Sequence, residues 1–323
     1  MGVSILFRRG LLHLLYENLE PDVMKNALVY LVISAVSYPF LAIYNSCAAL
    51  FRSMGNSKIS MQVSVVMNGI NIFGDAVFIF GFHMGVAGAA FASLISRMIA
   101  CVILMVRLFD PKLEITLKGT KFGWNQRIVG RILQIGIPSG VENSIFQLGR
   151  VIGVGFITTF GTTQIAANAV ANNLDALGIL PAQAMNLALI TVIGQCVGAG
   201  DYKQAEYYAK KLMKLTYLIN GVCCMTVIAT MPLTLKLYGL SAETLVLAAT
   251  LVLIHNGFAV LLWPASFTLT SVLRAANDVK YPMCISMLSM ILVRLGFGIC
   301  SVSGKDGVRS ASGRRRFWIG RCV

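Results

Sequence analysis

Long apolar runs, each about as long as a membrane crossing, follow one another along almost the whole chain. A helix needs roughly 20 apolar residues to cross the hydrocarbon core of a bilayer. Of the 323 residues, 57% are hydrophobic and 12% are charged, whereas soluble domains carry roughly a quarter charged residues. The runs lack the alternation of a transmembrane β-barrel, so only helices fit. We therefore predict an all-α integral membrane protein with about eight transmembrane helices.

Short polar gaps separate the predicted crossings. We place the crossings at 24–51, 60–82, 85–107, 131–160, 165–196, 211–238, 243–272 and 280–301, after a helix remnant at 1–15. Lys and Arg gather in every second gap, beginning with the one after the first crossing. An excess of positive charge marks the cytoplasmic side of a membrane protein. Every second loop is therefore predicted to be cytoplasmic.

The formal net charge of +14 invites comparison with nucleic-acid-binding proteins. Most of the basic residues lie between apolar runs, so we assign the charge to membrane orientation and exclude nucleic acid as a partner. The eight cysteines form no CxxC pair and indicate small buried side chains. The sequence contains no P-loop, HExxH or GxSxG motif, so we expect neither an enzyme nor an ATP-driven pump.

A long polar segment between two crossings and a change in composition near the end of the sequence predict the domain organisation. The polar stretch 108–130 is predicted to be a cytoplasmic linker between an N-terminal lobe at 1–107 and a C-terminal lobe at 131–301. Residues 302–323 turn abruptly polar and arginine-rich. They are either a genuine basic tail beside the membrane or an out-of-frame reading of the gene, and we favour the second.

An internal repeat supports the two-lobed organisation. The segment 52–64 aligns without gaps on 274–286, with identical residues at Arg52 and Arg274 and at Lys58 and Lys280. Both copies lie in a predicted cytoplasmic turn between two crossings, and transporters are often built from duplicated halves. The offset of 222 (274 − 52) places the counterparts of the crossings at 131–238 before residue 17. We therefore expect the chain to be an incomplete copy of a larger two-lobed protein.

The second predicted crossing carries three polar residues, Asn68, Asn71 and Asp75. Asn71 and Asp75 are four residues apart and so share one helix face. Carboxylate and amide oxygens suit Na⁺ coordination, and a carboxylate also suits a proton relay. The alternative is that Asp75 reaches toward an outer helix end while the asparagines bridge helices. We favour the cation site.

Glu142 and Arg150 lie about two turns apart on the fourth predicted crossing. Glu142 either binds a cation or proton, or lies in the first turn after Pro138 and only complements the helix dipole. The next crossing contains Asn172, Asn173 and Asp175, which either line a cavity or mark a solvated helix end. His83 and His255 have no partner nearby in the sequence and are predicted to be structural or interfacial.

Several motifs, in the correct order over roughly 10–300, resemble the multidrug and toxic compound extrusion (MATE) transporters. The matching segments are 50–58 with 68–75, Gly85-Val-Ala-Gly-Ala-Ala, Gly136-Ile-Pro-Ser-Gly140, 193–201 and 273–283. They resemble MATE helices four to eleven. The resemblance implies a fold of twelve helices in two lobes, with the N-terminal lobe here reduced to the end of helix three and helices four to six.

The resemblance also implies an activity, the expulsion of cationic or amphiphilic small molecules in exchange for Na⁺ or H⁺ by alternating access. It implies a monomeric multi-pass protein of the bacterial inner membrane, with a coupling ion and no other cofactor. In that family an aspartate on helix one joins an asparagine and an aspartate on helix five, which match Asn71 and Asp75. Two alternatives stay open: an exporter or flippase of lipid-linked precursors, favoured by Arg150, and an inactive fragment.

Overall fold

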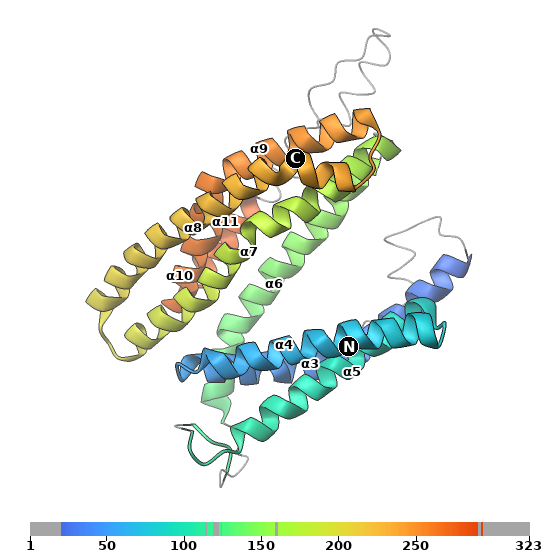
Figure 1. The fold of residues 1–323 in the computed structure, drawn as a ribbon. Helices are drawn as coiled ribbons and strands as arrows, with labels where there is room; N and C mark the ends of the chain where they lie inside the picture. Colours follow the sequence, from blue (N-terminus) through green and yellow to red (C-terminus); the bar gives the residue numbers. More distant parts are fainter. Residues whose placement is uncertain are drawn as a thin grey trace. The chain divides into compact units, whose positions relative to one another are not determined.

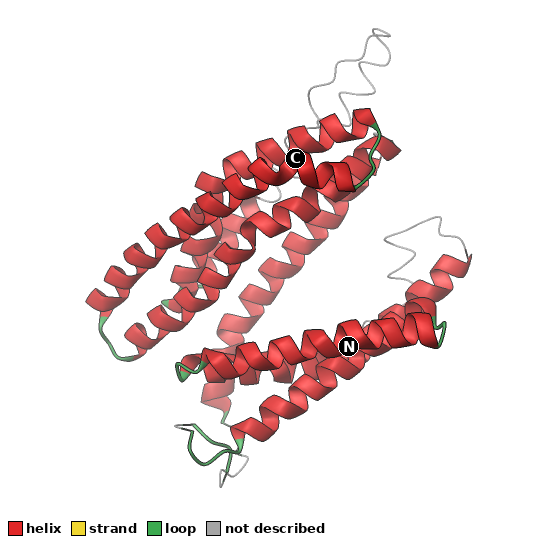
Figure 2. Cartoon of the chain, viewed as in Figure 1, coloured by secondary structure: helices red, strands yellow, loops and turns green. Residues whose placement is uncertain are grey.

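The computed structural model describes residues 21–113, 115–118, 123, 125–158, 161–289 and 292. This part of the chain is almost entirely helical and contains no strand (Figure 1, Figure 2). The prediction of an all-α protein is confirmed. The helix remnant predicted at 1–15, the end of the last crossing and the basic tail at 302–323 lie outside the described residues.

The chain divides into two compact units, Met1–Gly123 and Trp124–Val323. The division falls inside the polar stretch 108–130. The first unit holds α3 (Pro21–Ser53), α4 (Ser57–Ala76), the π-helical turn η1 (Val77–Gly81) and α5 (Gly85–Leu108). The second unit holds α6 (Gln126–Thr158), α7 (Thr162–Gly198), α8 (Tyr202–Leu237), α9 (Ala242–Trp263), the π-helical turn η2 (Pro264–Thr268), α10 (Leu269–Ala275) and α11 (Lys280–Ser289).

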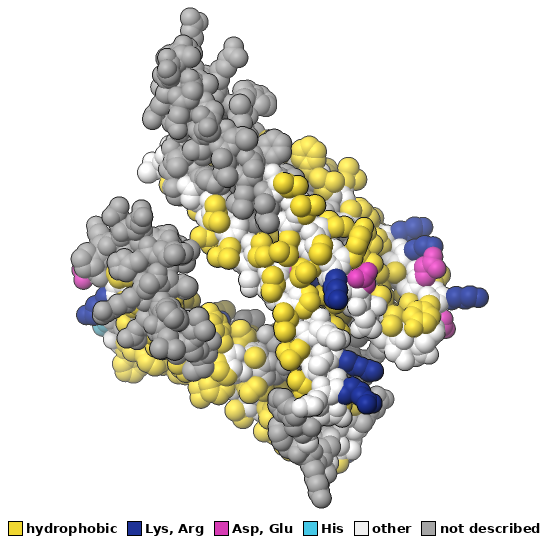
Figure 3. Space-filling view, turned by 180° about the vertical axis from the view of Figure 1, so that it is seen from behind, with side chains coloured by type: hydrophobic (Ala, Val, Ile, Leu, Met, Phe, Trp, Pro, Cys, Tyr) yellow, Lys and Arg dark blue, Asp and Glu magenta, His cyan; other side chains and the backbone are white. Residues whose placement is uncertain are grey.

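Six stretches of the described chain are helical, long and apolar enough to cross a membrane. They are Asp22–Ser53, Ser57–Gly81, Gly85–Leu108, Thr162–Gly198, Tyr202–Leu237 and Ala242–Ala275. The predicted crossing at 131–160 is a single helix, α6, but its polar side chains keep it out of this set. Apolar side chains cover much of the visible helix surface, as expected for helices that face lipid (Figure 3).

Helices α7 and α8 are the longest of the described helices and extend beyond the predicted crossings. At 1.5 Å per residue, the 37 residues of α7 and the 36 of α8 extend about 55 Å, well beyond the roughly 30 Å hydrocarbon core. The expected start of the crossing at 211 is therefore not where the helix starts. Helix α8 begins nine residues earlier (211 − 202), and Asp201 caps it by accepting a hydrogen bond from the Gln204 amide.

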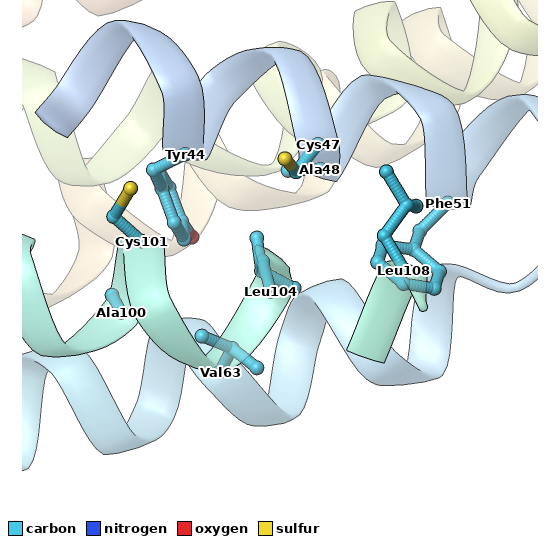
Figure 4. Close-up of a cluster of buried hydrophobic side chains, with 9 residues drawn as sticks. All are labelled: Tyr44, Cys47, Ala48, Phe51, Val63, Ala100, Cys101, Leu104 and Leu108. Atoms are coloured by element: carbon cyan, nitrogen blue, oxygen red, sulfur yellow. The ribbon is translucent and has the colours of Figure 1, made fainter. Parts of the chain in front are cut away.

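The core of the first unit combines large side chains with small ones. Tyr44, Cys47, Ala48 and Phe51 of α3, Val63 of α4, and Ala100, Cys101, Leu104 and Leu108 of α5 form its core (Figure 4). Helices in lipid gain little from the hydrophobic effect, so small residues that allow close approach carry the association. At Gly74 a Cβ would lie 3.0 Å from the Cβ of Ala92, which shows how closely α4 and α5 approach.

The second unit packs α7 against both α8 and α9. One core cluster joins Ala167, Val170, Ala171 and Leu174 of α7 to Met231 and Leu235 of α8 and to Leu247, Ala248 and Val252 of α9. A second cluster joins α7, α8 and α10 around Leu189, Ile193 and Ala205. These contacts hold the polar side chains of α7 and α9 at fixed positions.

The two copies of the sequence repeat adopt the same turn. Gly55 and Asn277, which are 222 positions apart (277 − 55), have positive φ angles of 75° and 68°. Their amides donate to the carbonyls of Arg52 and Arg274 at 2.9 and 3.0 Å. In both turns the next amide donates 2.9 Å to the carbonyl five residues earlier. This is the hydrogen-bond pattern of a helix C-terminus closed by a residue in the left-handed conformation, and the turn at Gly200 after α7 has it too.

Candidate functional site

Of the three polar residues predicted on the second crossing, Asn71 contacts the neighbouring helix α5. Asn71 is half-buried, and its amide nitrogen donates to the Ser93 hydroxyl of α5 at 3.3 Å. Asp75 follows one turn later on α4 and is also half-buried. Its Oδ1 is shielded from solvent and has no hydrogen-bond partner among the described residues. Asn68 is exposed. A shielded carboxylate oxygen without a donor, one turn from an amide side chain, fits the oxygen ligation that Na⁺ requires.

Arg97 is a functional candidate that the sequence reasoning missed. It lies in the middle of α5, one turn after Ser93, and its Nη1 donates to the Ser37 hydroxyl of α3 at 2.5 Å. Ser37 is 1% exposed. No acidic side chain in the described part of the chain lies within ion-pair distance of Arg97. A charged residue inside a crossing is costly, so the lone arginine between Gly85 and Arg107 was a signal available in the sequence.

Glu142 forms an ion pair with Arg274. The Glu142 Oε2 lies 2.7 Å from Nη2 of Arg274, and both side chains are largely buried. The contact is an ion pair without well-aligned hydrogen bonds, since Oε2 has no partner that meets hydrogen-bond geometry. The alternative that Glu142 lies in the first turn of its helix is wrong, because α6 begins at Gln126 and continues through Pro138. Neighbouring groups can satisfy the backbone freed by a proline in a membrane helix.

The polar residues predicted to cluster at 172–175 differ in how far α7 exposes them. Asn172 and Asn173 are exposed, whereas Asp175 is only 7% exposed. Asp175 lies well inside α7, so the alternative that it marks a solvated helix end is wrong. Arg150 is exposed on α6, and no contact joins it to Glu142 or to the asparagines among the described interactions.

Asp175 is held by two consecutive residues of α9. Its Oδ1 accepts a hydrogen bond from the Asn256 side-chain amide at 2.6 Å, and its Oδ2 lies 2.9 Å from Nδ1 of His255. Asn256 is fully buried and also donates to the Val252 carbonyl at 3.1 Å. His255, which has no partner nearby in the sequence, thus finds one on another helix of the fold. The signal was weak in the sequence because 80 residues (255 − 175) separate the pair.

Comparisons with known proteins place the chain in a family. The family model MatE matches residues 1–77 and 138–299. The uncharacterized transporter YisQ of Bacillus subtilis is 28% identical over 310 residues, covering 90% of this chain and 67% of that protein. A probable multidrug resistance protein NorM of Bacillus licheniformis is 24% identical over 313 residues, covering 94% of this chain and 67% of that protein.

Solved structures agree at the level of the fold. One, described as the outward-facing conformation of a multidrug resistance MATE family transporter, has a TM-score of 0.79 and 21% identity. The match covers 92% of this chain and 67% of the solved chain. The apolar helices and these matches together define the class of protein. It is a multi-pass α-helical membrane protein of the transporter class. The chain belongs to the MATE family, and it spans about two thirds of the length of these relatives.

Proposed function

We propose that this chain acts within a secondary active transporter that expels cationic or amphiphilic small molecules in exchange for Na⁺ or H⁺. The proposal includes alternating access of two lobes, a monomeric state and location in the inner membrane of a bacterium. It is supported by family membership and by relatives named as multidrug resistance proteins. One observation in this chain carries it, the shielded Asp75 carboxylate oxygen that lacks a hydrogen-bond donor.

The α4–α5 contact provides the groups that such an exchange requires. An ionised carboxylate within a membrane helix is costly unless a cation or proton neutralises it. Asp75 would supply the charge, and Ser93 and Asn71 would supply further polar atoms at the same helix contact. Binding and release of the ion would then change the charge buried between the two helices. No catalytic chemistry is required of these residues.

The alternative of a lipid-linked-precursor exporter is not favoured. It requires a basic cavity, and Arg150, on which it rested, is exposed and contacts none of the other candidate residues among the described interactions. The named relatives also point to drugs rather than lipids. Four residues stay candidates for contact with substrate: Glu142, Asn172, Asn173 and Asp175.

The test is dye efflux from cells that lack their own drug pumps and express the full chain. We expect Asp75→Asn to lose ion-driven efflux by roughly tenfold or more, because the neutral amide cannot alternate between charge states. Asp110→Asn, in the polar segment after α5, is the matched control and should retain efflux. Efflux by Asp75→Asn that still responds fully to the Na⁺ or H⁺ gradient would contradict the role of Asp75.

A further inference from the structure

Asp175 is a buried carboxylate in the bundle of α7, α8 and α9, which has few other charged side chains along its middle. It is the one acidic or basic residue of α7. Helix α9 carries Glu243 in its first turn and His255 further along. Between Lys214 and Lys236, α8 contributes only Tyr217, Cys223 and Cys224 as titratable groups. Helix α10, which also packs on α7, carries only Arg274, and Arg274 is paired with Glu142 of α6. Helix α6 packs on α7 too, and its other charged residues are Arg127, Arg131 and Arg150.

Both oxygens of Asp175 face nitrogen atoms that donate. The Asn256 amide donates to Oδ1 at 2.6 Å, and His255 Nδ1 lies 2.9 Å from Oδ2. An ionised carboxylate only accepts, so His255 must carry a hydrogen on Nδ1. A metal cation at this carboxylate would have to displace these N–H groups or lie against them. The arrangement therefore disfavours a metal ion and leaves the imidazole as the group that exchanges a proton.

Among the described residues, no hydrogen bond is made to the second ring nitrogen of His255, which is then an available acceptor. In a neutral imidazole with hydrogen on Nδ1, the lone pair is on Nε2. The His255 side chain is 52% exposed whereas that of Asp175 is 10% exposed, so the ring joins the buried carboxylate to the surface of the bundle. We propose that the Asp175–His255 pair is a proton-binding site, with Nε2 of His255 taking up and releasing the proton.

Proton uptake by His255 transfers one proton and no other group. A hydronium ion gives one proton to Nε2, a new N–H bond forms, and water is left behind. The neutral ring beside Asp175 gives the pair a charge of −1, and the imidazolium form makes the pair neutral overall. An uncompensated charge inside a membrane bundle costs several kcal/mol, so proton binding changes the energetics of the α7–α9 contact. Any role of this site in transport rests on the proposed exchange function, whereas proton binding itself does not.

The test is a pH titration of the full chain, labelled with ¹⁵N-histidine and held in lipid nanodiscs, by NMR. Only three histidines contribute signals, and His255→Gln identifies the one from His255. We expect this signal to change from the Nδ1-protonated tautomer to the doubly protonated ring as the pH falls. Asp175→Asn, which preserves shape, should move the midpoint by roughly one pH unit or more. His83→Gln is the control and should leave the titration of His255 unchanged.

Two outcomes would overturn the site. One is a His255 ring that keeps a single protonation state across the whole pH range in which the protein stays folded. The other is a titration that Asp175→Asn does not move. Dye efflux separates this proposal from the proposed function: wild-type protein that expels no dye contradicts the exchange function, while the NMR titration still decides whether His255 binds a proton.

Discussion

Individual polar residues in this chain are positioned by close helix contacts, and Gly178 is the sharpest example. A Cβ added to Gly178 of α7 would lie 2.6 Å from Oδ1 of Asn256 and 3.5 Å from Sγ of Cys224. The absence of a side chain at Gly178 therefore lets the Asn256 amide lie beside α7, where it bonds Asp175. The geometry of the Asp175 pair thus depends on a residue that has no side chain.

We expect Gly178→Ala to destabilise the protein by about 1–3 kcal/mol, because the methyl group must displace the buried Asn256 side chain. The measurement is thermal unfolding of the purified chain in detergent. Gly221→Ala on α8 is the matched control, since its nearest contact would be 3.7 Å from a Val260 methyl group. Alanine also favours helix over glycine by up to about 1 kcal/mol. Equal stability of the two variants would show that α7 and α9 do not need this close approach.

At the scale of elements, the repeated turn after α3 and after α10 depends on residues that tolerate a left-handed backbone. Glycine adopts positive φ without cost, and asparagine does so more easily than most residues. The two long helical stretches that lead into these turns end 222 positions apart, at Ser53 and Ala275. The next helices begin at Ser57 and Lys280. These two helix ends therefore recur at the same spacing of 222 as the repeated sequence.

We expect Asn277→Val to destabilise the protein by about 1–2 kcal/mol, because a β-branched residue is strained at a φ of 68°. Asn277→Gly should be neutral or slightly stabilising, since glycine already occupies the equivalent position 55. Thermal unfolding checks both variants, and Gly55→Val should behave like Asn277→Val if the turns are equivalent. A destabilised Asn277→Gly variant would mean that the asparagine side chain, not the backbone conformation, holds the turn.

Many of the helix positions can be predicted from the sequence. Apolar runs mark the crossings, and Lys and Arg mark the gaps between them. The predicted crossing 85–107 differs from α5 by one residue at its end. The predicted crossing at 211–238 begins after the true start of α8 at Tyr202, because the first turns of α8 are polar. A helix that continues beyond the hydrocarbon core carries no apolar signal there. The pairing of Asp175 with His255 and Asn256 depends on how α7 packs against α9, which neither residue spacing nor composition records.

At the scale of the whole molecule, the distribution of charge predicts how the chain crosses the membrane. The gap at Phe82–Met84 carries no Lys or Arg, whereas Lys203, Lys210, Lys211 and Lys214 lie in the first turns of α8. Positive charge near helix ends favours the cytoplasmic side. The turn at Asp201 and the turns at Gly55 and Asn277 should therefore all face the cytoplasm, and the turn at His83 should face the other side.

Reporter fusions test this orientation in the membrane of a bacterial host. We expect alkaline phosphatase joined after His83 to be active, because that enzyme folds only where disulfides form outside the cytoplasm. A phosphatase joined after Asp201 should be inactive, and green fluorescent protein at the same position should fluoresce. Fusions after Gly55 serve as a second cytoplasmic reference on the other unit. The opposite pattern would invert the membrane orientation on which the assignment of inner and outer faces depends. Mixed activity at His83 would show that the charges of the gaps do not fix one topology.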